Sequence, residues 1–299
     1  MRVTQSMLSS NMLRNLSNSY SKMGKLQNQI ETGKKVTRPS DDPVVAMKGI
    51  GYRTELNNVE QFSRNIGEAY NWLDTTDDTL DKVNSALQRA NELMVQASSD
   101  TTTSDDRKKI DGELQQLREH IQNLANTQVG DRYIFSGTKT TTPPYQNGVG
   151  YVTGSNPEES IDPSFEKSIE IEVFDGIMLK VNTTPIQLLN DIDKMFDDIG
   201  KDIKAGTTGA DLSKYITTID SNMNELLTTR ADIGARQNRV ELMDSRLQSQ
   251  EIIATSRMSE NEDIDYEKTI TDFITQESIH TAALSMGSKI IKPTLVDFL

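Results

Sequence analysis

The side chains that most often carry chemistry are few in this sequence and stand apart from one another. The two histidines, His120 and His280, lie in separate helical segments, and neither belongs to a recognisable catalytic motif. Adjacent aspartates occur at Asp77-Asp78, Asp105-Asp106 and Asp197-Asp198. Such pairs bind a cation only with further ligands nearby, and the sequence offers none. Phosphate loops, dinucleotide glycine patterns and HExxH are also missing. We therefore expect a protein that is not an enzyme and has no catalytic, cofactor-binding or metal site.

The composition indicates thin packing with a large surface. The 299 residues are 34% hydrophobic and 5% aromatic, which is little apolar material for a thick core. A net charge of −13 argues against nucleic acid as a partner, since neutralising phosphates requires a basic surface. There is no cysteine to form disulfides or thiolate metal sites. The longest apolar run is Val44–Met47, so no membrane insertion is expected.

The two ends of the chain carry opposite charge and matching apolar patterns. Residues 1–41 have a net charge of +5 and residues 259–299 a net charge of −5, which suggests that the ends meet. Both ends place apolar side chains three and four residues apart, as amphipathic helices do. Isolated helices of this kind are marginal in water, so we expect the tails to order on assembly. Their apolar positions are Leu13, Leu16, Tyr20, Met23, Ile30, Ile270, Phe273, Ile279, Met286 and Ile290.

Two long helices are expected between the tails. The first spans residues 43–97 and would be roughly 80 Å long if unbroken. The second, residues 212–258, has the same apolar rhythm and is its natural antiparallel partner. Asp42-Pro43 has the types expected of an N-cap followed by the first helical residue. Gly33 is expected to end the N-terminal tail helix.

Shorter helices flank the long pair. Residues 104–124 form a helix that Ser104 would cap and Gly130 would stop. Residues 185–203 form another, with Thr184 as its expected cap before Pro185. Between these two helices the sequence pattern changes to one that is typical of β-strands. Residues 168–181 alternate apolar and polar side chains around Asp175-Gly176, which is typical of a two-residue hairpin turn.

These patterns predict a mainly α fold with a β-rich insertion. We expect an elongated rod of long antiparallel helices whose N- and C-terminal helices pair as a coiled coil on assembly. The tails comprise residues 1–42 and 259–299, and the helical rod domain comprises residues 43–134 and 185–258. Residues 135–184 form the insertion.

Two motifs in the helical regions resemble the flagellin family of bacterial axial proteins. LQRANELMVQ, residues 87–96, is similar to the segment that closes the family's first long helix. GARQNR, residues 234–239, resembles the family's GAxQNR signature on the returning helix. The likeness covers about residues 1–137 and 185–299, and the middle is not diagnostic. The motif residues at the matching positions are Gln88, Arg89, Glu92, Gln237, Asn238 and Arg239.

Three further segments favour the family's hook–filament junction members over filament flagellin. RPSDDP, residues 38–43, stands where filament flagellins typically have an alanine-rich KDDAAG-like segment. YIFSGT, residues 133–138, resembles the junction members' entry into their β domain, and PTLVDFL, residues 293–299, resembles their terminal signature. Thr294 departs from the serine expected there, a minor change. The residues that carry this likeness are Arg38, Pro39, Asp41, Asp42, Pro43, Asp297, Phe298 and Leu299.

The resemblance implies a structural adaptor located at the hook–filament junction of the bacterial flagellum. It would be exported through the flagellar type III channel, which needs no cleaved signal, and the N-terminal residues indeed lack a secretory signal's apolar core. Its implied partners are its own subunits in a ring-like layer, the first hook-associated protein, flagellin and a flagellar export chaperone. The alternatives are filament flagellin itself and a cytoplasmic coiled-coil scaffold. A weaker hypothesis is that innate immune receptors that detect flagellin recognise residues 87–96.

Overall fold

The structure is a computed structural model that describes residues 5–99, 102–146, 150–151 and 163–290. The chain divides into two compact units, one of Met1–Asn58 with Ser249–Leu299 and one of Val59–Gln248. The divisions fall inside helix α2 (Pro43–Ala97) and helix α7 (Lys214–Glu262). Both long helices therefore contribute to both units.

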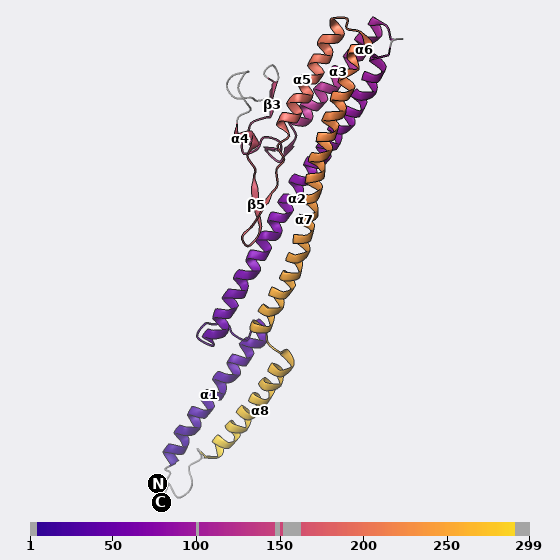
Figure 1. Ribbon diagram of the computed structural model, residues 1–299. Coiled ribbons are helices and arrows are strands. Elements are labelled where there is room, and N and C mark those ends of the chain that lie inside the picture. The colour runs from indigo at the N-terminus through magenta and orange to yellow at the C-terminus, as the bar shows by residue number, and fades with distance from the viewer. Residues whose placement is uncertain (1–4, 100–101, 147–149, 152–162, 291–299) are drawn as a thin grey trace, which may run out of the picture. The chain divides into compact units, whose positions relative to one another are not determined.

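The first unit pairs the two tail helices. Helix α1 (Gln5–Thr32) lies beside helix α8 (Tyr266–Ile290), as Figure 1 shows. Helix α1 ends at Gly33, whose φ of +70° is the left-handed conformation that a helix-ending glycine supplies. The Oδ1 atom of Asp42 accepts from the N–H groups of Val44 (3.0 Å) and Val45 (3.1 Å) at the start of α2. The predicted helix stop at Gly33 and the predicted cap at Asp42 are both confirmed.

The second unit is built on α2 and α7 running antiparallel. Arg230 of α7 donates to Asp77 Oδ1 (2.9 Å) and Asp81 Oδ1 (2.6 Å) of α2. Further along α2, Asn91 Nδ2 donates to Asp220 Oδ1 (2.7 Å), which lies earlier in α7. Helix α3 (Ser104–Ala125) packs against helix α5 (Ile186–Lys204), and the one-turn helix α6 (Gly209–Leu212) precedes α7 (Figure 1).

A seven-residue repeat lies at the centre of this packing. A side chain every seventh residue in each long helix is at most 6% exposed, which is the spacing that keeps the facing sides of two helices together when they wind around each other. In α2 these residues are Val59, Ile66, Leu73, Leu80, Leu87 and Met94, and in α7 they are Ile219, Leu226, Ile233, Val240, Leu247 and Ala254.

The described residues between α3 and α5 contain short antiparallel strand pairs. The first pair, β1 (Gln128–Val129) with β2 (Arg132–Tyr133), lies just before the predicted insertion. Two further pairs lie within it, namely β3 (Tyr145–Gln146) with β4 (Gly150–Tyr151) and β5 (Glu170–Phe174) with β6 (Ile177–Lys180). A single helical turn, α4 (Pro163–Glu166), precedes β5.

The β5–β6 hairpin confirms the predicted turn. Gly176 has φ +70°, and Phe174 pairs with Ile177 across the turn. The Phe174 ring lies 6.1 Å from the Phe62 ring of α2, and the Arg246 guanidinium of α7 lies 4.2 Å from the Phe174 ring centroid. One aromatic side chain thus fastens the hairpin to both long helices.

Two predicted features at the ends of α3 were wrong. Thr103, not Ser104, caps the helix, and its Oγ1 accepts from the N–H of Asp106 (3.3 Å). Adjacent hydroxyl residues offer the same chemistry, so the sequence alone does not choose between them. Gly130 does not end α3, which stops at Ala125, but takes φ +60° in the turn between β1 and β2.

The predicted caps and bounds of the later helices also change. Helix α5 begins at Ile186 after Pro185, and Thr184 makes no cap, because the N-cap position is one residue later than expected. Helix α7 begins at Lys214 and continues to Glu262, four residues past the predicted end. The predicted fold class, mainly α with long antiparallel helices and a β-rich insertion, is confirmed.

Two adjacent leucines of α7 test the apolar seam, which is the row of buried side chains that recurs every seven residues in α2 and α7. Leu226 is fully buried, whereas Leu227 is 47% exposed. We expect Leu226→Ala to lower the free energy of unfolding by about 3 kcal/mol, because it leaves a cavity in a close-packed seam. Leu227→Ala should change it by less than about 0.5 kcal/mol. Urea denaturation followed by circular dichroism measures both, and equal losses would contradict the assigned seam.

Candidate assembly interface

The tail helices α1 and α8 contact each other along one narrow side. On α1 the predicted residues Leu16, Met23 and Ile30 are half-buried, and Phe273 is half-buried on α8. The contact also contains polar groups that the apolar pattern does not reveal. Ser19 is buried and accepts a hydrogen bond of 2.7 Å from Nε2 of Gln276.

Small and aromatic residues complete the α1–α8 contact. Gly287 is buried under the end of the Met12 side chain, so any Cβ at this position would overlap that side chain. The His280 ring lies 6.0 Å from the Tyr20 ring, tilted by 47°. His280 is therefore a residue of this helix contact, while His120 lies exposed on α3.

The remaining predicted tail residues are not buried by this contact. Leu13, Ile270, Ile279 and Met286 are exposed. Tyr20 is also exposed, although its ring lies beside that of His280. Ile290 closes α8, and the structure does not describe its side chain. The apolar residues that face the partner helix and those beside the contact have similar spacing in the sequence. The spacing alone therefore did not distinguish the two groups.

Helix α8 is apolar on more sides than one partner can cover. At 100° per residue, Ile270 and Ile274 lie on one flank of the contact, and Ile279 and Met286 on the other. Large apolar side chains exposed on both flanks of a helix contact mark surface that further protein can cover. Pairing with α1 therefore buries only part of the apolar surface of α8, and the flanks of α8 are available to further helices.

A cluster of charged groups joins the tails to the long helices. The Glu262 side chain at the end of α7 is 10% exposed and accepts from Arg53 Nη2 of α2 at 2.7 Å. Lys34, just past α1, lies 3.5 Å from Glu262 and 2.5 Å from Asp263 Oδ1. The hydrogen bond between Lys34 and Asp263 lowers the pKa of Asp263 and raises that of Lys34.

Backbone hydrogen bonds lock the same place, which we call the joint (residues 33–35, 49, 53 and 259–264). The N–H of Lys35 donates to Glu262 O (2.6 Å), and the N–H of Ile264 donates to Gly33 O (3.0 Å). Asn261 Nδ2 donates to Val45 O at 3.0 Å. The opposite charges of the two tails, noted in the sequence, therefore meet in specific pairs at the joint.

The RPSDDP segment shapes the approach to the joint. Asp41 Oδ2 accepts from the N–H of Arg38 at 3.2 Å, which closes the turn before the Asp42 cap. Arg38 and Pro39 are exposed, and both line a hollow beside the first turns of α2. Pro43 is the first residue of α2, as predicted.

The LQRANELMVQ segment divides into a buried and an exposed side. Arg89 reaches from α2 to Glu113 of α3 (2.8 Å) and to Glu92 one turn on (2.9 Å). Gln88, Arg89 and Glu92 are exposed, whereas Leu87 and Met94 are buried. The segment thus packs inward with its leucines and presents its polar side chains outward.

The GARQNR segment contributes to the α2–α7 contact through one residue. Gln237 Nε2 donates to Asp74 Oδ1 of α2 at 2.9 Å. Asn238 and Arg239 lie exposed on the other side of α7. Asp297, Phe298 and Leu299 lie outside the described residues.

Sequence reasoning missed an ion-pair network inside the second unit. Arg118 of α3 binds Asp193 of α5 through two nitrogens, at 2.7 and 2.9 Å, and Gln122 donates to the same carboxylate at 2.6 Å. Asp197 is 3.2 Å from Arg118. These partners are some 75 residues apart in the chain, so no local motif marks them.

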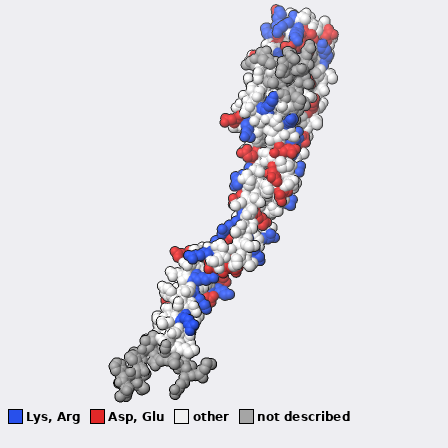
Figure 2. Space-filling view, turned by 90° about the vertical axis from the view of Figure 1, so that its left-hand side faces the viewer, with Lys and Arg blue, Asp and Glu red and all other residues white. Residues whose placement is uncertain are grey.

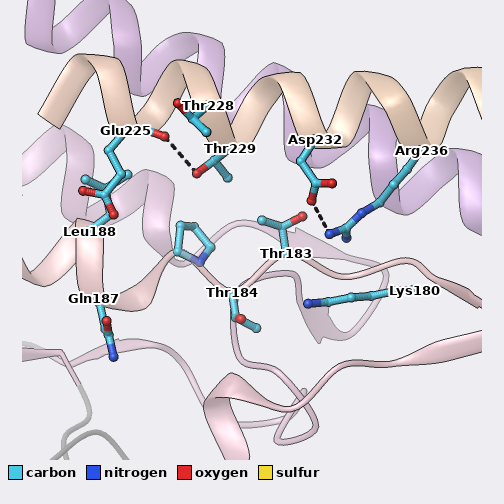
Figure 3. A pocket seen from close by; sticks show the side chains of 11 residues that line it. Lys180, Thr183, Thr184, Gln187, Leu188, Glu225, Thr228, Thr229, Asp232 and Arg236 are labelled. Atoms are coloured by element: carbon cyan, nitrogen blue, oxygen red, sulfur yellow. Dashed lines mark hydrogen bonds and ion pairs between the residues drawn. The ribbon is translucent and has the colours of Figure 1, made fainter.

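A polar hollow lies where β6, the start of α5 and α7 meet (Figure 3). Lys180, Thr183 and Leu188 line it with Glu225 and Arg236, among others. Arg236 is engaged with Asp232 on its own helix and donates to Asn182 O at 3.0 Å. The hollow's charges are balanced, and Arg236 anchors the β6–α5 connection to α7.

The described residues provide little else for chemistry. They contain no group of three or more His, Cys, Asp or Glu side chains that could hold a metal ion. Among the described helices, none has the length and apolar character needed to cross a bilayer. Figure 2 shows acidic and basic side chains interspersed over the face in view. The exposed apolar flanks of the tails are the more distinctive feature.

Long helices from both halves of the chain, with paired ends that leave apolar side chains exposed, define a mainly helical protein with uncovered apolar surface at its ends. Comparison with known proteins agrees. Residues 3–140 match the bacterial flagellin N-terminal helical region, and residues 216–299 match the bacterial flagellin C-terminal helical region. The chain belongs to the bacterial flagellin family, which confirms the resemblance seen in the sequence.

Individual relatives place the chain within that family. It is 30% identical to flagellar hook-associated protein 3 of Escherichia coli K12, over 93% of both chains. It is 25% identical to flagellin of Bacillus subtilis, over 96% of this chain and 95% of that one. A putative flagellar hook-associated protein from Vibrio parahaemolyticus has a similar fold, with a TM-score of 0.62, 23% identity and coverage of 75% of this chain and 100% of that one.

Two glycines of α2 test the joint. An added Cβ at Gly49 would lie 2.5 Å from Glu262 Oε1, whereas at Gly51 no atom lies within 4 Å. Either change to alanine favours the helix by about 1 kcal/mol. Gly49→Ala should also displace the carboxylate from Arg53, whose pairing is worth about 1 kcal/mol at this partly exposed place.

We therefore expect Gly51→Ala to leave the joint's amides as protected as in the wild type. Gly49→Ala should speed hydrogen exchange at the Lys35 and Ile264 amides by about fivefold, the equivalent of ~1 kcal/mol. Mass spectrometry of the self-associated chain measures both. Equal protection in the two variants would show that the Glu262 carboxylate does not hold the joint.

Proposed function

We propose that this chain is a structural adaptor of the bacterial flagellum, joining the hook to the flagellin filament. The observation that carries this proposal is the incomplete burial of the paired end helices. Helix α8 has apolar side chains on both flanks of its contact with α1, including Ile274 and Met286, which are exposed in the single chain. Exposed apolar surface of this kind marks a site of contact with another protein, here neighbouring subunits. The chain's relatives include flagellar hook-associated protein 3.

The partners follow from this assignment. The chain would form a ring-like layer with its own subunits, bind the first hook-associated protein on one side and contact flagellin on the other. It would leave the cell through the flagellar type III channel without a cleaved signal, escorted by a flagellar export chaperone. Its role is mechanical, with neither catalysis nor nucleic-acid binding.

Residues 1–42 and 259–299 are proposed to order on assembly. Before assembly, α1 has one half-buried stripe and α8 lacks cover for its flanks, so the pair is marginal in isolation. Residues 43–134 and 185–258 form the helical domain that is already folded, and residues 135–184 form the insertion. The joint then marks where ordering begins.

Filament flagellin is the second candidate, because the Bacillus subtilis flagellin is 25% identical over 96% of this chain. Deleting the gene separates the two. Loss of an adaptor should leave hooks present and exported flagellin free in the medium, because filaments cannot attach. Hooks that carry long filaments in the deletion strain would overturn the adaptor assignment. Antibody labelling of wild-type flagella should show a band at the distal end of the hook rather than staining along the filament.

Limited proteolysis tests the tails and a third candidate, a cytoplasmic coiled-coil scaffold. We expect the dilute chain to be a monomer from which protease removes about forty residues at each end. A scaffold would instead form a stable dimer with resistant ends. Light scattering and mass spectrometry of the trimmed core distinguish them, and resistant ends at micromolar concentration would contradict assembly-dependent ordering.

A further inference from the structure

An apolar patch covers the outer side of α2 next to the joint. Val44, Met47 and Ile50, here called face A, are 62%, 75% and 64% exposed. The opposite side of the same turns is occupied, since Gly49 is buried against Glu262 and the carbonyl of Val45 accepts from Asn261. These two turns of α2 are therefore apolar on a side that the chain itself does not cover.

A second apolar patch lies on the outer side of α7 in the same unit. Ile252 and Ile253, here called face B, are 71% and 48% exposed, while the next residue, Ala254, is buried. At 100° per residue, Asn261 lies on the same side of α7 as Ala254, toward α2, whereas Ile252 lies on the far side and Ile253 on the flank next to it. Faces A and B thus lie on opposite sides of the α2–α7 pair in the first unit.

The charges around the two faces are opposite. Face A is flanked by exposed Arg38 and Lys48, and Arg38 lines a hollow of about 260 Å³ next to Ile50. Face B is flanked by exposed Glu251 and Glu260.

The countercharges near each face are already engaged. Asp41, beside face A, accepts from the N–H of Arg38 and from the Thr37 hydroxyl, and Asp42 accepts from the N–H groups of Val44 and Val45. Arg257, beside face B, lies 4.0 Å from Glu55 of its own chain. The basic surround of face A disfavours contact with a second face A, and the acidic surround of face B likewise disfavours its own kind.

We infer that face A of one chain binds face B of a second copy of the same chain. Apolar side chains meet at the centre, and Arg38 and Lys48 face Glu251 and Glu260 at the rim. Because the two faces differ and lie on opposite sides, the contact repeats from chain to chain and generates a ring or a helical layer rather than a closed dimer. This inference rests on the proposed assembly function and identifies a lateral contact outside the tail helices.

Disulfide cross-linking can test the contact. Because the chain has no cysteine of its own, disulfides between copies form only at introduced cysteines. Flagella would be isolated from cells that express Met47→Cys/Ile252→Cys in place of the wild type and then oxidised. We expect a ladder of dimers, trimers and larger species. Each single variant should remain a monomer, because it can join only like faces. The matched control is Lys82→Cys/Ile252→Cys, which moves one cysteine to an exposed position of α2 in the second unit. An equal ladder from this control would overturn the contact.

A charge exchange provides a second measurement that does not need cysteines at the contact. Lys48→Glu should reduce the number of filaments retained per cell after shearing, and adding Glu251→Lys should restore it. If Lys48→Glu is harmless, or if the second change gives no rescue, the charged rim is wrong.

The same flagella separate this inference from the proposed function. Antibody labelling at the distal end of the hook together with a ladder supports both. The same labelling without a ladder from the double cysteine variant overturns the contact and leaves the adaptor function standing. A ladder with labelling along the filament supports the contact and overturns the adaptor function.

Discussion

A single apolar seam between α2 and α7 is the constraint on which the second unit depends. The seam has one fully or nearly buried side chain every seven residues in each helix, from Ile66 to Met94 and from Ile219 to Val240. A seven-residue spacing keeps the same faces together over many turns. The other elements pack on this pair. Helices α3 and α5 cover one end of it, and Phe174 holds the β hairpin against its side.

The seam also explains why so much of this chain could be read from its sequence. Periodicity, glycine and proline act locally, so the long helices, the Gly33 stop, the Asp42 cap and the hairpin at Gly176 were all predictable. The errors at Ser104 and Thr184 arose where neighbouring residues of similar chemistry compete for one cap. Only the local backbone conformation decides between them.

The candidate interface was less predictable, for a physical reason. The α1–α8 contact uses Ser19, Gln276 and Gly287, which no hydrophobicity pattern selects, and leaves Ile279 and Met286 exposed. The joint likewise depends on pairs more than 200 residues apart, such as Arg53 with Glu262. The opposite net charges of the tails indicated that such pairs exist, but charge sums do not identify partners. Gly49 leaves room for the buried carboxylate, but the sequence does not distinguish it from Gly51 and Gly67 of the same helix, which have open space around them.

The charged groups of the first unit fall into two sets. One set is paired within the chain and fixes its helices, and the other is exposed around apolar side chains. Glu262 is buried and fully engaged, which fixes α1, α2 and α7 relative to one another within that unit. Charged groups that are already paired in this way cost little further desolvation and add little to a new contact. Arg38, Lys48, Glu251 and Glu260, by contrast, remain at the surface around uncovered apolar side chains. Exposed charges of this kind select a partner and its orientation, while the apolar side chains between them supply the affinity.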